Sequence, residues 1–176
     1  MATLPTTTSK SVGAKVQALD WNTYVKGNDD FFIFNRPVCL AYTNVTQSIA
    51  TSAATNLLFE LERIDRDNQH NTATNTDRVV IGNTLGWYRV TATVSWAANA
   101  TGVRNIFIGL NGATVTGAYM HGSATGAVQV QQVTTIVQAT ASTDFVTAGV
   151  FQSAGVALST NITTSTSSIL VEWIGS

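Results

Sequence analysis

The chain has 176 residues, which is the usual size of one compact domain with a short appendage. Its formal net charge of −1 gives no electrostatic basis for binding nucleic acid or an anionic membrane surface. Only 11% of the residues are charged, against roughly 25% in soluble domains, and from Ala97 onward the charges are confined to Arg104, Asp144 and Glu172. So few charges predict that part of the surface is buried against other copies of the chain.

Residues 1–37 have the character of an attachment arm. The first ten are rich in threonine and predict an extended segment. Apolar residues then recur at helical spacing, and they are Val12, Val16, Leu19, Trp21, Tyr24 and Val25. They predict one short helix over about residues 18–27.

An aromatic run, Phe31-Phe32-Ile33-Phe34, follows this helix and ends before Pro37. Four such side chains are costly to expose to water, so the arm is expected to dock on its own domain or on a partner. The candidate partner-binding residues of the arm are Trp21, Tyr24, Phe31, Phe32 and Phe34.

The remainder, residues 38–176, has the pattern of strands and predicts a second unit, an all-β domain. In Gly86–Trp96, apolar and polar side chains alternate. In a strand, Tyr88 and the other even-numbered residues therefore point to one face, and Trp87 and the other odd-numbered residues point to the other face. Asn111-Gly112 predicts a tight hairpin turn, because its geometry needs positive φ at both central positions. The predicted strands are 38–43, 56–64, 78–81, 86–96, 104–110, 113–119, 127–140, 145–152 and 168–174. Their number and spacing predict an antiparallel sandwich or jelly roll.

The sequence shows no signal for secretion or for membrane insertion. The N-terminus lacks the apolar core of a secretory signal, and no apolar run approaches about 18 residues. Cys39, the single cysteine, lies in an apolar run and is expected to be a small buried residue rather than a nucleophile.

Catalytic motifs are missing from the sequence. There is no Gly-x-Ser-x-Gly, no phosphate-binding loop, no dinucleotide-binding glycine pattern and no His-Glu-x-x-His. His70 and His121 are both expected in exposed loops. Acidic pairs for glycoside hydrolysis are scarce as well. We therefore expect no enzymatic activity, no catalytic residues and no cofactor.

Two groups of residues have alternative interpretations. Oxygen-bearing residues alternate in the loop 65–77, which predicts either a calcium site or, more simply, a hydrated turn without metal. Strand aromatics are either a sugar-binding platform or, more often, residues of a core or a subunit interface. These aromatics are Trp87, Tyr88, Trp96 and Trp173.

Four stretches together resemble the trimeric jelly roll of the complement globular-head and tumour necrosis factor families. They are GWYRVTATVSW, RNIFIGLNGATV, DFVTAGVFQ and the closing SSILVEWIG. The resemblance implies an antiparallel jelly-roll sandwich that forms a homotrimer. It places Trp87, Tyr88, Trp96 and Trp173 at the trimer interface. The calcium ligands of the complement type have no counterpart in this chain.

The whole chain is also similar to small virion proteins of tailed phages that infect actinobacteria. The similarity lies in TLPTTT, in LDWNTYVKGNDDFFIFNRP and in TDRVVIGNTLGWYRVTATVSWAANATGVRNIFIGLNG. It implies a virion protein of the capsid-decoration, head-fibre or minor-tail type. The preferred hypothesis is a capsid decoration protein, made in the host cytoplasm and located on the capsid surface of the virion. The arm is then expected to bind the major capsid protein. The alternative is a tail or head-fibre adhesin that binds host-surface glycans through loops such as 65–77 and 121–126.

Overall fold

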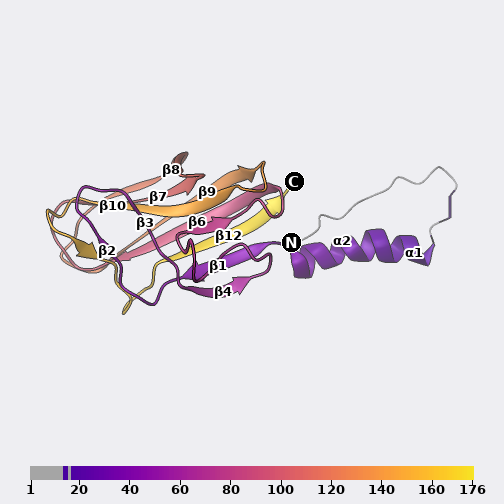
Figure 1. Cartoon of the computed structure of the whole chain (residues 1–176), viewed down its shortest axis with the longest axis horizontal. Coiled ribbons are helices and arrows are strands. Elements are labelled where there is room, and N and C mark those ends of the chain that lie inside the picture. Colours follow the sequence, from indigo (N-terminus) through magenta and orange to yellow (C-terminus); the bar gives the residue numbers. More distant parts are fainter. Residues whose placement is uncertain (1–13, 16) are drawn as a thin grey trace.

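The structure is a computed structural model that describes residues 14, 15 and 17–176. The threonine-rich residues 1–10, with Val12 and Val16, lie outside the described residues. The described chain forms a helical segment followed by a sandwich of two antiparallel sheets, and the helix extends from one end of the sandwich (Figure 1).

The helical segment is longer than the sequence predicts. It consists of α1 (Ala18–Asp20), η1 (Trp21–Lys26), α2 (Gly27–Asp30) and η2 (Phe31–Asn35), where η denotes wider π-type turns. Gly27 does not interrupt it, because its φ of −63° and ψ of −37° are helical. The aromatic run is therefore helical too. Arg36 leaves the helix with a ψ of 131°, as expected for a residue before proline.

The sandwich confirms the predicted fold class. The first sheet has the order β4-β1-β12-β6-β9, and the second has β3-β10-β7-β8, with β5 also beside β10. The short strands β2 and β11 pair separately as a small two-stranded sheet. Every strand pairing in the described part of the chain is antiparallel. The strands are β1 (Val38–Tyr42), β2 (Ser48–Ile49), β3 (Thr55–Asn56), β4 (Leu61–Asp65), β5 (Arg78–Val80), β6 (Gly86–Trp96), β7 (Val103–Leu110), β8 (Ala113–Ser123), β9 (Gln129–Ala139), β10 (Phe145–Gln152), β11 (Leu158–Ser159) and β12 (Ser168–Gly175).

Two predicted strands differ from the structure. The predicted strand 56–64 is split, because the chain passes from β3 in the second sheet to β4 in the first. Leu57 and Phe59 are buried at this crossing, and their N–H groups donate to the Ala148 and Thr76 carbonyls. The strand β8 extends to Ser123, so that His121 lies opposite Asn105 in a strand and not in a loop.

The core fills the space between the two sheets. In β6 the side chains of Tyr88, Val90 and Ala92 are buried, while Trp87 and Arg89 face outward, which confirms the alternation that the sequence predicts. Each large apolar side chain buried in this way contributes about 1.5–3 kcal/mol of transfer free energy. The alternation of β6 therefore determines which of its side chains remain available for a partner.

The β7–β8 turn is the tight hairpin that the sequence predicts. Asn111 and Gly112 have φ angles of 52° and 83°. Asn111 also connects this turn to the chain before β10, because its Nδ2 donates to Asp144 Oδ1 at 2.8 Å and its Oδ1 accepts the Phe145 N–H at 3.0 Å. The β7–β8 hairpin is thereby fixed to the neighbouring strand at this end of the second sheet.

Candidate functional site

The base of the helix is attached to the sandwich by aromatic packing. Phe31 is only 3% exposed, and its ring meets Trp173 edge-on with a centroid separation of 5.2 Å. Trp173 is itself held in place by its Nε1–H, which donates to the Leu85 carbonyl at 3.1 Å. The prediction that Phe31 binds a partner protein is therefore corrected, because its side chain docks on its own domain.

Beyond this base, the helix exposes large apolar side chains. The structure places Trp21, Phe32 and Phe34 at 59%, 56% and 64% exposure, which leaves three of the predicted arm residues accessible. The side chain of Tyr24 lies outside what the structure describes. Leu19, Val25 and Ile33 are exposed as well and were not among the candidates. The sequence signal for Leu19 and Val25 was the apolar spacing that predicted the helix, and Ile33 lies within the aromatic run.

An isolated helix with apolar side chains over so much of its length is unstable in water, because tertiary packing supplies most helical stability. The described contacts of the helix with the sandwich involve Phe31 and Phe32 against Trp173, at its base. Figure 1 shows the rest extending away from the sheets. The helix is therefore a candidate attachment surface.

Three of the four predicted interface aromatics are core residues. Tyr88 and Trp96 are 0% exposed and Trp173 is 3% exposed, whereas Trp87 is 43% exposed. Tyr88 and Trp96 have the same parity in β6 and point between the sheets. Of these four residues, only Trp87 remains a candidate for the subunit interface. The other three agree with the alternative interpretation, in which strand aromatics belong to the core.

Hydrogen bonds fix the polar atoms of the buried aromatics. The Tyr88 hydroxyl donates to the Thr84 carbonyl at 2.6 Å, and Trp96 Nε1–H donates to Gln131 Oε1 at 2.9 Å. Burial, with a smaller effect of the Asp67 carboxylate, raises the pKa of Tyr88. These aromatics therefore form no accessible sugar-binding platform.

The part of the first sheet formed by β12, β6 and β9 carries few charges on its outer face. Across β12, β6 and β9 the only charged residues are Arg89 and Glu172, and they face each other at 3.5 Å. The centre of this face is built from hydroxyls and amides that bond across strands. Thr91 and Thr134 are joined at 2.9 Å, and Gln132 Nε2 donates to Thr93 at 3.0 Å.

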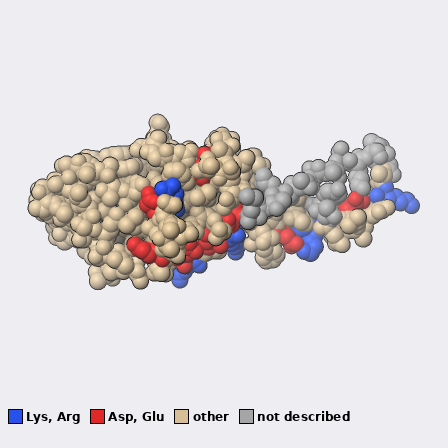
Figure 2. Space-filling model, in the orientation of Figure 1, with Lys and Arg blue, Asp and Glu red and all other residues tan. Residues whose placement is uncertain are grey.

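We call this outer surface of β12, β6 and β9 the threonine face, after Thr91, Thr93 and Thr134 at its centre. Exposed apolar side chains extend it. Val130 and Ile136 in β9 are 49% and 52% exposed, and Leu170 in β12 is half-buried between Leu40 and Thr91. In the view of Figure 2, charged side chains gather toward the β4 edge of the sandwich and along the helix. The threonine face is a second candidate contact surface.

The loop between β4 and β5 uses its carboxylates internally. Asp65 accepts the backbone N–H groups of Gln69 and His70 at 2.9 Å each, and Asp77 accepts from Asn56 Nδ2 at 2.9 Å. Among the described residues, no three His, Cys, Asp or Glu side chains converge. The geometry is that of a hydrogen-bonded turn.

His70 is buried, which corrects the prediction of an exposed histidine. Its Nδ1 lies 2.9 Å from Glu62 Oε1, and its Nε2 lies 3.3 Å from the Thr76 carbonyl, so both ring nitrogens are engaged. His121 is exposed on β8. Cys39 is buried as predicted, and desolvation, followed by the carboxylates of Asp65 and Glu62, raises its pKa.

No helix in the part of the chain that the structure describes combines the length and the apolar character needed to cross a membrane.

The two sheets and their strand order define a jelly roll of the tumour necrosis factor and complement globular-head type. The structure matches murine APRIL, as seen in its crystal structure at pH 5.0, with a TM-score of 0.58 and 12% identity over 78% of this chain and 98% of the other. It matches the globular domain of the zebrafish complement 1qA protein with a TM-score of 0.58 and 11% identity, covering 79% of this chain and 98% of that domain.

The sequence itself matches no family model and no curated protein. At these identities the comparisons establish the fold and nothing finer. The similarity to phage virion proteins and the domain boundary between residues 37 and 38 stay predictions.

Proposed function

We propose that this chain is a non-enzymatic structural protein that forms homotrimers and decorates a phage capsid. Two features of the structure together support this proposal. A helix with exposed apolar side chains is attached to one end of the sandwich, and the threonine face of the sandwich has no unpaired charge. A jelly roll alone needs neither feature.

The threonine face supports association between copies. An interface core disfavours charge, because an unpaired charge removed from water costs several kcal/mol, whereas threonine and glutamine side chains bond within the sheet. In this proposal Trp87, Leu170 and Ile136 lie at contacts between neighbouring copies. Burying about 1,000 Å² of apolar surface per subunit contributes on the order of 25 kcal/mol, before the costs of association are subtracted.

The helix supports attachment to a shell. Phe31 and Trp173 hold its base, so three helices leave the same end of the trimer and present Trp21 and Phe34 to grooves of the major capsid protein or to one another. The added contacts between capsid subunits resist the internal pressure of packaged DNA. The protein, made in the host cytoplasm, is then found on the capsid surface of the virion.

The test replaces exposed apolar side chains of the helix and keeps its base. The double variant Trp21→Gln/Phe34→Gln retains Phe31, so the helix stays attached to the sandwich. We expect it to remain trimeric by sedimentation velocity and to lose co-sedimentation with capsids of the phage that encodes the chain. The matched control is Val156→Gln, a residue with 57% exposure outside the helix, which should bind like the wild type.

Full occupancy of capsids by the double variant would refute the role of the helix. Mass spectrometry of purified virions gives the copy number, for which we expect hundreds per particle. A few copies per particle would instead indicate the alternative, an adhesin on the tail or head fibre.

A further inference from the structure

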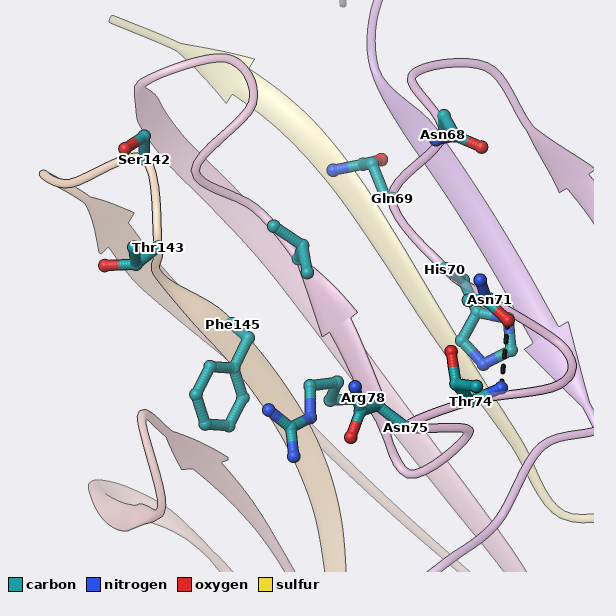
Figure 3. Close-up of a pocket in the computed structure, with 11 residues that line it drawn as sticks. Asn68, Gln69, His70, Asn71, Thr74, Asn75, Arg78, Ser142, Thr143 and Phe145 are labelled. Carbon is teal, nitrogen blue, oxygen red and sulfur yellow. Dashed lines mark hydrogen bonds between the residues drawn. The ribbon is translucent and has the colours of Figure 1, made fainter.

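A pocket of about 590 Å³ opens between the β4–β5 loop and the turn that precedes β10 (Figure 3). Its wall includes Gln69 and Thr74 from the loop, Arg78 from β5, and Thr143 with Phe145 from the other side. This volume lies within the range that holds small-molecule ligands, roughly 300–1,000 Å³. The pocket is far in the sequence from the helix and uses no residue of the threonine face.

Gln69 is the most informative residue of this wall. It is 1% exposed, and neither its Oε1 nor its Nε2 has a hydrogen-bond partner among the described residues. Its backbone is fixed, because its N–H donates to Asp65 Oδ1 at 2.9 Å and its carbonyl accepts the Val80 N–H at 2.6 Å. Figure 3 shows the amide extending from the loop toward the side of Ser142.

A buried polar group without a partner costs about 1–3 kcal/mol, so folded proteins rarely keep one without a purpose. The free amide of Gln69 offers one acceptor and a donor pair side by side. A ligand that fits it must present a donor and an acceptor at neighbouring positions, as two adjacent hydroxyl groups do.

Arg78 supplies a second unused donor and a flat surface. Its guanidinium lies over the Phe145 ring, 4.6 Å from the centroid, and its buried Nε–H has no hydrogen-bond acceptor in the described structure. Asp77 Oδ1 is 3.6 Å from this nitrogen, which is too long for a hydrogen bond but balances the charge. The remaining ionisable group of the wall, His70, is engaged at both ring nitrogens.

The geometry points to a binding site for a neutral saccharide unit. The amide of Gln69 pairs with two adjacent hydroxyls, the Arg78 Nε–H donates to a sugar oxygen, and Thr74 and Thr143 complete the wall. A neutral ligand is favoured over an anion because Asp77 already balances Arg78. The inference goes beyond the proposed function and does not depend on where the trimer is attached.

The test uses saturation-transfer NMR on the full chain with five neutral probes and one charged probe. The neutral probes are glucose, galactose, mannose, arabinose and N-acetylglucosamine, and the charged probe is glucuronate. We expect at least one neutral sugar to bind with a dissociation constant of about 1 mM.

The variants Gln69→Leu and Thr74→Val should each weaken this binding by about tenfold or more. Thr72→Val, in the same loop but outside the wall, is the matched control and should bind normally.

A second readout separates a binding role of Gln69 from a structural one. If the amide serves a ligand, Gln69→Leu removes an unpaired polar group from the interior and should unfold at the same or a higher temperature. The inference is overturned by any of four results: no binding of a neutral sugar, binding of glucuronate alone, unchanged binding by Gln69→Leu, or a lower unfolding temperature of that variant.

Discussion

At the scale of single residues, Asp144 holds two turns together. Its carboxylate accepts the backbone N–H groups of Ala141 at 2.9 Å and Thr140 at 2.7 Å, and Asn111 Nδ2 donates to it at 2.8 Å. The Ala141 N–H, then the Asn111 amide and the Thr140 N–H, lower the pKa of Asp144, because each hydrogen bond favours the charged form.

We predict that Asp144→Asn lowers the free energy of unfolding by about 1–3 kcal/mol at neutral pH. A carboxyl whose pKa is lower in the folded state contributes stability above its unfolded pKa of about 3.9, and loses it as the pH falls through the folded value. The difference between wild type and variant should therefore shrink below about pH 4. Urea unfolding of both proteins at the same protein concentration, at neutral pH and in acid, measures this difference in the free energy of unfolding.

The control for this prediction is Asp29→Asn, which changes an exposed carboxylate of the helix. It should alter stability by less than about 0.5 kcal/mol at either pH. An Asp144→Asn variant that is as stable as the wild type, or a gap that persists unchanged in acid, would show that the carboxylate does not brace the turns.

At the scale of elements, Gly86 determines how β6 begins. Its φ is 133°, and a Cβ at this position would lie 2.3 Å from the Gly175 carbonyl oxygen and 2.6 Å from Trp173 Nε1. Both the backbone angle and the space require glycine here. The contact also places the first residue of β6 against the end of β12, where Trp173 receives the helix.

We predict that Gly86→Ala costs about 1–3 kcal/mol or more, because it combines an unfavourable φ with a backbone clash. Gly126→Ala is the matched control, since its added Cβ meets only the Ala100 methyl at 4.0 Å. Thermal unfolding followed by circular dichroism should show a lower midpoint for Gly86→Ala and little change for the control. Equal midpoints would mean that the chain relaxes around the new methyl group.

Elements with local signals were predictable from the sequence. The bounds of β6 and the Asn111-Gly112 turn follow from alternation and from turn geometry, and the structure confirms both. The path of residues 56–64 was not predictable, because one apolar stretch serves equally as a continuous strand or as a crossing between sheets. The extension of the helix to Asn35 was missed because aromatic residues have weak helix propensity and gain stability here from Trp173.

The candidate surfaces were predictable only in part for a related reason. Alternation shows that Tyr88 and Trp87 point in opposite directions, but only the packing of the second sheet decides which of them is buried. The arm residues Phe32 and Phe34 were found because an exposed aromatic run is unusual in any context, and Trp21 was found through the helical spacing of apolar residues. No sequence signal distinguishes Gln69 from the other amides of its loop.

At the scale of the whole molecule, the proposed trimer can be tested on the threonine face. Leu170 lies on this face in β12, half-buried, with Leu40 and Thr91 beside it. We predict a trimer for the wild type in sedimentation velocity at micromolar concentration and a single-chain species for Leu170→Glu, because association would bury an unpaired carboxylate.

Val156→Glu, an exposed loop position, is the control for this variant and should remain trimeric. A wild-type chain that sediments as a single, well-behaved species would refute the trimer itself. In that case the low charge content of the chain would need another explanation.

The position of β1 also has a mechanical consequence. β1 follows directly after the helix and lies between β4 and β12, with antiparallel hydrogen bonds on both sides. Antiparallel hydrogen bonds run perpendicular to the strands, so tension applied lengthwise through the helix loads all of them in shear at once rather than opening them one by one. An anchor of this kind resists force much better than a peripheral strand that peels away from its sheet.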